Sequence, residues 1–259
     1  MIIIIPTKGR IGKQLTIQNL PKQLYHKVYL VCPEKEKFWH QQNHSQITVN
    51  TQPDPDMGIS AKRKWIIDTT DDEKIVMLDD DLRFAYRRTD NPTLFRKAEE
   101  ADLLEAFQQL ENILSPEIPH AGFAVRGSGI GAAAQVGGWQ TTGKRAMYSL
   151  AYYLPTVKAN AEFGRLSTHE DIDVTLQLLR KGFPNAINFS FVTDQKFGAQ
   201  GGCSNERTME QNNLDVLELT KLHPSYVRVT EKEYKVSTPR LECVVSWQKA
   251  LEHGIRNRK

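Results

Sequence analysis

The chain has 259 residues, of which 39% are hydrophobic, 8% aromatic and 25% charged, and 34 Lys and Arg against 31 Asp and Glu give a formal net charge of +3. This composition excludes a disordered or collagen-like chain, and its near balance of charge permits a polyanionic partner without requiring one. Three widely separated cysteines with no CxxC pair argue against a cysteine zinc site and favour a reducing, cytoplasmic setting.

The first part of the chain alternates short apolar runs with segments of helical character. It predicts strands at residues 2–6, 27–33, 46–51 and 74–78. The run IIII at the start is typical of a strand that is buried on both faces of a parallel sheet. A helix is expected at residues 60–70, with Ser60 as its N-cap. This alternation predicts a doubly wound α/β sheet.

The second part predicts further helices and strands without an internal repeat or a linker. Amphipathic patterns predict helices at residues 99–114, 167–183 and 209–223. Strands are expected at the start of the glycine-rich segment 122–139 and at residues 146–155 and 185–194. Gly182 is expected to end the helix 167–183. We therefore predict one domain over residues 1–259.

Three consecutive carboxylates, Asp79, Asp80 and Asp81, follow the predicted strand 74–78. In open α/β sheets, ligands bind beyond the carboxyl ends of the strands. Asp79 and Asp81 are two residues apart, so their side chains point the same way in an extended chain. Two such oxygen donors suit Mg²⁺ or Mn²⁺, which share their remaining positions with water and phosphate. A solvated turn is the alternative.

A second acidic cluster, Glu170, Asp171 and Asp173, begins the predicted helix 167–183. Ser167 and Glu170 have the spacing of a capping box, which is a purely structural alternative. Two acidic groups that face one crevice, however, are what a metal-plus-base active site requires.

The motifs together resemble the nucleotide-sugar-dependent glycosyltransferases of the GT-A fold. Four segments carry the resemblance, in the family's order, across residues 2–183: IIPT (4–7), GISAKRK (58–64), DDD (79–81) and EDIDVTLQLLRKGF (170–183). It implies an α/β, Rossmann-like, doubly wound mixed sheet. It also implies a nucleotide-sugar-binding half at residues 1–115 and an acceptor-binding half at residues 116–259.

The resemblance also implies roles for individual residues, with Mn²⁺ or Mg²⁺ as cofactor and a UDP-sugar, with glucose as the sugar, as donor. Asp171 would be the general base of an inverting reaction, with Glu170 beside it. The metal ligands would be Asp79 and Asp81 with a late third ligand, Asp194, for which His223 is the alternative. The residues expected to line the nucleotide are Pro6, Thr7, Lys8, Arg10, Lys62, Arg63, Asp79 and Asp80. A solvated helix face is the alternative for residues 62–64.

Within the GT-A fold the layout is similar to that of the base-J-associated and phage DNA glucosyltransferases, through PTKGR, LDDD, HEDID and a later GG. That likeness implies a 5-hydroxymethylpyrimidine in DNA as acceptor, and hence DNA as a partner. The target base would leave the stack, and the candidates to stack on it are Trp139, Tyr148, Tyr152 and Tyr153. Strand packing is the alternative for the pair Tyr152 and Tyr153. A loop is expected at residues 196–207. With it, a positive rim would be formed by Arg126, Lys144, Arg145 and the basic tail Arg256, Arg258 and Lys259.

Other functions remain open from the sequence. A saccharide or cell-envelope acceptor is the first alternative. A nucleotidyltransferase is a minor one, because TKGRIGK partly matches its signature. A nucleic-acid-binding module without activity is a third. The spacing of Gly127, Gly129 and Ala132 mimics a dinucleotide fingerprint, but no acid follows about 20 residues later, so NAD binding is rejected.

The chain contains no apolar stretch of membrane-spanning length, so we expect no membrane segment. The expected location is the cytoplasm, which is the host cytoplasm if a phage encodes the protein. Any work on a membrane would be done from its surface.

Overall fold

The computed structural model of the chain describes residues 1–126, 137–142, 148–195, 208–232 and 240–258. The glycines of the rejected dinucleotide fingerprint and most of the predicted glycine-rich segment lie outside these ranges. So do the loop predicted at residues 196–207 and the rim residues Lys144 and Arg145.

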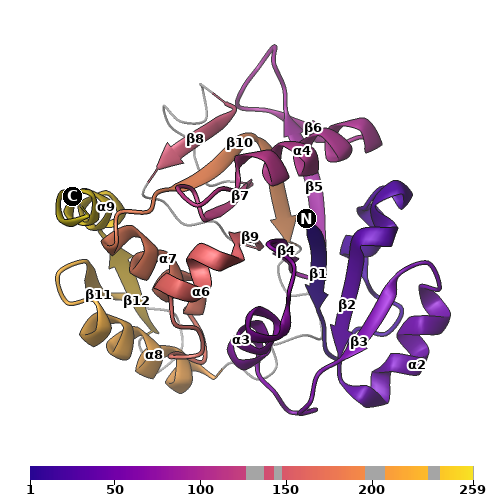
Figure 1. Cartoon of the computed structure of the whole chain (residues 1–259), viewed down its shortest axis with the longest axis horizontal. Helices are drawn as coiled ribbons and strands as arrows, with labels where there is room; N and C mark the ends of the chain where they lie inside the picture. The colour runs from indigo at the N-terminus through magenta and orange to yellow at the C-terminus, as the bar shows by residue number, and fades with distance from the viewer. Residues whose placement is uncertain (127–136, 143–147, 196–207, 233–239, 259) are drawn as a thin grey trace.

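The helices and strands of the described residues follow one another in a largely alternating order (Figure 1). The helices are α1 (Leu15–Asn19), a 3-10 helix η1 (Lys22–Lys27), α2 (Glu34–Asn43), α3 (Ile59–Thr69), α4 (Glu100–Ile113), α6 (Leu154–Asn160), α7 (Glu170–Arg180), α8 (Met209–Leu222) and α9 (Trp247–Asn257). The strands are β1 (Ile2–Pro6), β2 (Val28–Cys32), β3 (Thr48–Thr51), β4 (Lys74–Leu78), β5 (Leu82–Arg87), β6 (Phe95–Lys97), β7 (His120–Val125), β8 (Trp139–Thr142), β9 (Ser149–Tyr153), β10 (Asn185–Gln195), β11 (Val227–Lys232) and β12 (Arg240–Val245).

One mixed sheet organises the molecule. Among the described residues its order is β3-β2-β1-β4-β9-β7-β10-β5-β6, with β8 paired to β10 beside this path. The first four strands are parallel, whereas β9 runs antiparallel to both β4 and β7. The order 3-2-1-4 is the first half of a doubly wound nucleotide-binding sheet. The predicted α/β class with a mixed sheet is confirmed.

The residues of β1 alternate between two cores, one on each face of the sheet. Ile3 and Ile5 join the cluster under α4, while Ile4 joins the cluster under α3, α6 and α7. All three side chains are at most 3% exposed. The unbroken IIII run is therefore explained as predicted, because both faces of a central strand need apolar side chains.

A third cluster joins α7 to the C-terminal elements. Leu176 and Leu179 of α7 belong to one buried cluster with Leu219 of α8, Leu251 of α9 and Tyr226, which precedes β11. Figure 1 shows α8, α9 and the β11–β12 hairpin on the opposite side of the molecule from β2, β3 and α2. Helix α7 is consequently covered both by the sheet and by the C-terminal elements.

Helix α7 ends in a Schellman turn. The amide of Gly182 donates to the carbonyl of Leu179, and the amide of Phe183 donates to that of Leu178. Gly182 has φ +81°, a conformation that other residues rarely adopt. The predicted helix stop at Gly182 is confirmed.

Two local predictions and one structural alternative are wrong. The N-cap of α3 is Gly58, and Ser60 is buried inside the helix. The predicted strand 146–155 ends at Tyr153, because Leu154 begins α6 with Pro155 in its first turn, where proline is tolerated. The capping box of Ser167 and Glu170 does not form, since α7 starts after His169. Within the described ranges, no helix has the length and apolar character needed to cross a bilayer.

The approach of α9 to the end of α7 leaves no room for a side chain at Gly254. A Cβ there would lie 2.1 Å from the Leu179 carbonyl oxygen and 2.3 Å from the Gly182 amide nitrogen. We predict that Gly254→Ala lowers the free energy of unfolding by about 3 kcal/mol, because this clash outweighs the helix propensity of alanine. Urea unfolding measures the change. Gly58→Ala, where a Cβ meets nothing within 4 Å, is the control, and equal stability of both variants would contradict the packing described.

Candidate active site

Asp80 ties the loop after β1 to the turn after β4. The Thr7 hydroxyl donates to its carboxylate and in turn accepts from Gln14 Nε2 at 2.8 Å. Arg10 Nη1 lies 3.1 Å from the other Asp80 oxygen. Burial raises the pKa of Asp80 to about 6, against the opposing effects of the Thr7 hydrogen bond and the Arg10 charge. Asp80, Thr7 and Arg10 therefore form a framework between two neighbouring strand ends.

Asp79 and Asp81 converge on one point beside this framework. Gln195 Nε2, at the end of β10, lies 3.0 Å from Asp79 Oδ2 and 2.7 Å from Asp81 Oδ1. Arg10 Nη1 contacts the second oxygen of Asp81 at 2.7 Å. The two side chains thus face the same side, as their spacing predicted.

This arrangement fits a divalent cation held by two carboxylates. One oxygen of each carboxylate accepts a hydrogen bond from the same nitrogen, Gln195 Nε2. The two oxygens are therefore placed to share one positively charged partner. Mg²⁺ and Mn²⁺ are commonly bound by one or two carboxylates, with water and phosphate oxygens completing the shell. Within the described ranges, no group of three His, Cys, Asp or Glu side chains is placed to hold a metal.

Arg63 joins the first acidic motif to the second. Its Nη2 donates to Asp79 Oδ1 at 2.7 Å, and its Nη1 donates to Glu170 Oε1 at the start of α7. Burial alone would lower the pKa of Arg63, but the charges of Glu170 and Asp79 outweigh it and raise the pKa. One buried guanidinium therefore holds residues 79 and 170 at the same site.

Beneath Arg63 lies an aromatic pair. Tyr152 is 1% exposed and stacks on His120, with ring centroids 4.8 Å apart. Burial lowers the pKa of His120 to about 4, so the ring is neutral at pH 7. Tyr152 belongs to the core and cannot stack on an acceptor base, which corrects that prediction.

The two acidic motifs each adjoin a residue with an unusual backbone. Within the described part of the chain, Tyr148 and His169 are the non-glycine residues with positive φ, both at 62°. The Tyr148 carbonyl accepts from the Asp79 amide at 3.0 Å, and His169 directly precedes Glu170. Such strain costs of order 1–3 kcal/mol and is concentrated at functional sites.

The nucleotide-side residues predicted from the sequence fall into two groups. Lys62 is 3% exposed and donates from Nζ to the Thr7 carbonyl at 2.8 Å, and so it supports the loop after Pro6. Lys8 is half-buried, with its Nζ 3.9 Å from Asp56. Of the predicted cations, Lys8 lies nearest to the surface, whereas Lys62, Arg10 and Arg63 are engaged inside the protein.

Residues 1–202 match the TET-associated glycosyltransferase family. The chain belongs to this family. The match spans the loop after β1, both acidic motifs and Arg63. It confirms the predictions that the protein is an enzyme and a glycosyltransferase, and the GT-A resemblance agrees with it.

Related sequences are found in bacteriophages. The chain is 24% identical over 241 residues to the Beta-glucosyl-HMC-alpha-glucosyl-transferase of Enterobacteria phage T6, a match that covers 87% of this chain and 82% of the relative. The phage T2 protein of the same name is 23% identical over the same shares.

Solved structures share the fold. The mannosyltransferase PcManGT from Pyrobaculum calidifontis, solved with GDP-Man and Mn²⁺, superposes with a TM-score of 0.51 at 11% identity, covering 85% of this chain and 62% of that chain. A TarS fragment from S. aureus gives a TM-score of 0.48 at 14% identity, covering 85% and 66%. The chain thus spans slightly less than two thirds of these solved chains, and the first likeness supports the GT-A fold alone.

In this family member, Asp194 and His223 lie apart from Asp79 and Asp81. Asp194 pairs with Arg126 at 3.2 Å, and the adjacent Gln195 reaches the two aspartates instead. His223 is 0% exposed and binds Asp173 at 2.7 Å. The structure does not gather the predicted third ligand, and the sequence offered no sign of Gln195 except its place one residue after Asp194.

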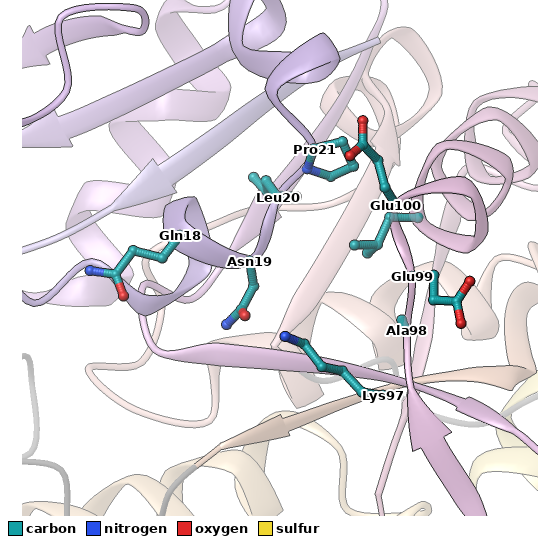
Figure 2. Close-up of a pocket in the computed structure, with 9 residues that line it drawn as sticks. Gln18, Asn19, Leu20, Pro21, Lys97, Ala98, Glu99 and Glu100 are labelled. Carbon is teal, nitrogen blue, oxygen red and sulfur yellow. The ribbon is translucent and has the colours of Figure 1, made fainter.

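A separate hollow of about 530 Å³ lies between α1 and the start of α4. Figure 2 shows Lys97 on the side of Asn19, and Glu99 and Glu100 on the other side. None of the acidic-motif residues lines it. The capping box of Glu99 and Asp102 already occupies amides of the α4 N-terminus, and these carboxylates would repel a diphosphate. The donor site is therefore not this hollow.

Asp173 anchors the far side of α7. It accepts a bidentate contact from Arg165 and a hydrogen bond from His223. Burial would raise the pKa of Asp173, but these two partners lower it. The contacts of Asp173 with Arg165 and His223 stabilise α7, the helix that presents Glu170 and Asp171.

We predict that Asp173→Asn lowers the free energy of unfolding by about 3–5 kcal/mol at pH 7, because a buried ion pair loses one charge. The pKa of Asp173 is depressed in the folded state, so its contribution is present above the unfolded value of about 3.9 and is lost as pH falls through the folded pKa. The difference between the two proteins should shrink in urea unfolding below about pH 4. Asp72→Asn, at an exposed position, is the control, and a pH-independent difference would refute the charge assignment.

Proposed function

We propose that this protein transfers glucose from a UDP-sugar to a hydroxyl of a 5-hydroxymethylpyrimidine in DNA, with a divalent metal and with inversion. The observation that carries the proposal is the Arg63 contact that holds Asp79 and Glu170 at one site. Family membership supplies the class of reaction, and the names of the phage relatives, which contain HMC and glucosyl, support the acceptor and the sugar.

On the donor side, Asp79 and Asp81 would hold Mn²⁺ or Mg²⁺. The bound cation supplies positive charge for the diphosphate leaving group. Lys8, which is half-buried beside the loop after β1, is suited to contact a phosphate oxygen. Arg10, already 2.7 Å from Asp81, keeps that carboxylate in place.

On the acceptor side, Asp171 would be the general base. Glu170 is committed to Arg63, so within this pair Asp171 is the carboxylate suited to accept a proton. The acceptor hydroxyl gives its proton to Asp171, and its oxygen forms the new bond to the anomeric carbon. The bond from that carbon to the diphosphate breaks, and UDP leaves with the electron pair. Attack on the face opposite the leaving group inverts the anomeric carbon.

A second candidate acceptor is a hydroxyl of a sugar already attached to the base. It is favoured by the relatives' printed name, in which HMC stands between two glucosyl terms. The same carboxylates serve both acceptors, because only the distance from the base to the hydroxyl differs. A saccharide or cell-envelope acceptor without DNA remains the alternative outcome.

We predict that Asp171→Asn reduces transfer at least about 100-fold, because a positioned base contributes that much or more. The thermal shift with UDP-glucose and Mn²⁺ should persist, since donor binding does not need the base. Asp81→Asn should lose the Mn²⁺-dependent part of the shift, as should the wild type in EDTA. Asp194→Asn is the matched control and should keep it. Normal turnover by Asp171→Asn would disprove the base assignment.

The acceptor is tested with four substrates: an oligonucleotide with 5-hydroxymethylcytosine, the same strand with a glucosylated base, the unmodified strand and an oligosaccharide. We predict a mass gain of one hexose on one or both of the modified strands and none on the other two, because unmodified bases carry no hydroxyl and the oligosaccharide has no DNA backbone to be bound. Mass spectrometry measures the gain. Transfer to the oligosaccharide alone would reject the DNA acceptor.

A further inference from the structure

We propose that Arg83 and Arg126 bind a backbone phosphate of the acceptor DNA strand next to the target nucleotide. Phe95, on the edge strand β6, completes the set. We call this set the arginine platform. The inference rests on the proposed function, because it names where the acceptor strand lies relative to the acidic site. Neither residue belongs to the catalytic or donor contacts described above.

The platform begins one rung of the sheet away from the acidic site. Gln195, which contacts Asp79 and Asp81, is the register partner of Leu82 across β10 and β5. The next rung pairs Asp194 with Arg83. Adjacent residues of a strand are about 3.3 Å apart along it. Side chains of adjacent residues point to opposite faces of a sheet, so Arg83 faces the side of Ala85, which is the side that α7 covers. A phosphate held at Arg83 therefore lies on the face from which α7 presents Glu170 and Asp171, near the strand end that carries the acidic site.

The three members of the platform come from β5, from β6 and from the residue that follows β7. Arg126, just after β7, pairs with Asp194 at 3.2 Å, and its guanidinium carbon lies 5.5 Å from the centre of the Phe95 ring. Phe95 of β6 is the register partner of Arg87, whose guanidinium carbon is 4.5 Å from the same ring. The ring is thus fixed between two guanidinium groups.

Cations outnumber acids in the segment that forms β5 and β6. Residues 82–97 include the cations Arg83, Arg87, Arg88, Arg96 and Lys97 and the single acid Asp90. Three of these cations already have partners within the chain, because Arg87 donates to two carbonyls, Arg88 pairs with Asp90, and Arg96 pairs with Asp102. Arg83 is exposed and makes no ion pair with any residue that the structure describes.

Arg83 and Arg126 together present two positive charges against the one negative charge of Asp194. The Arg126 side chain is 53% exposed, so a ligand can reach it. A guanidinium binds two phosphate oxygens at once, and DNA carries its phosphates at regular intervals along the strand. A positive surface with an aromatic ring is the usual combination for single-stranded nucleic acid. These features favour a nucleic-acid backbone over a neutral saccharide.

The test compares two acceptors that differ in their phosphates. One is an oligonucleotide with a single modified base, and the other is the corresponding nucleoside, which has no flanking phosphate. The variants are Arg83→Gln, Arg126→Gln and the double variant. Arg96→Gln, which removes the same charge from the opposite face of β6, is the matched control, and Arg83→Lys with Arg126→Lys tests rescue by charge.

We expect the double variant to raise KM for the oligonucleotide about 10-fold and to lower the slope of its logarithm against the logarithm of salt concentration by about 1 to 2. The KM for the nucleoside, the kcat and the melting temperature should remain within twofold or a few degrees of the wild type. Arg96→Gln should leave every value unchanged, and the lysine variants should recover most of the salt dependence.

An unchanged oligonucleotide KM in the double variant would overturn the inference, as would an equal rise for the nucleoside. Failure of the wild type to modify either acceptor is a different result. It would reject the proposed acceptor itself, and binding of the platform to an acidic protein or an anionic membrane would then have to be considered in its place.

Discussion

The candidate active site depends on one buried guanidinium. Arg63 donates one nitrogen to Asp79 and another to Glu170, which belong to motifs about 90 positions apart in the chain. Removing a buried charge from water is costly, and it is tolerated here because two carboxylates face it. The arrangement fixes the distance between the motif that would hold a metal and the helix that would present a base.

Helix α7 packs between the central sheet and the C-terminal elements. Its apolar side chains enter two separate cores, and Asp173 makes a buried contact with His223 on the far side. The C-terminal elements therefore do more than shield α7 from water. They hold in place the helix whose first turn carries Glu170 and Asp171, so a change near α9 reaches the acidic site through rigid packing.

The apolar pattern and the acidic motifs made much of this fold predictable. The run IIII, the alternation of the first half and Gly182 each reflect a local requirement of a buried strand or a helix end. The wrong predictions arise where a distant residue decides. Glu170 has capping-box spacing from Ser167, but Arg63 binds it instead, and no local pattern reveals a partner 107 positions away. Tyr152 looked available for stacking because burial depends on how the whole sheet is covered.

For the site itself, the sequence placed both carboxylate groups at strand and helix ends, and the structure brings Asp79 and Glu170 together. The sequence alone did not reveal that Asp80 and Lys62 would hold the framework, or that Gln195 would contact Asp79 and Asp81. Each outcome depends on which side chain points inward at the end of a strand. At the end of β10, a shift of one residue decides whether Asp194 or Gln195 points inward.

That choice is made by a bend in β10. The first residues of this strand pair with β8 and the last with β5, and the register against β7 shifts between Asn188 and Val192, where the Asn188 side chain accepts from two backbone amides. A deletion or insertion of a single residue within this irregular stretch would exchange the orientations of everything beyond it. Asp194 would then face Asp79 and Asp81. Three carboxylates would lie together where the Gln195 amide now contacts two. The identity of the innermost group is thus set by a backbone irregularity six or seven residues upstream.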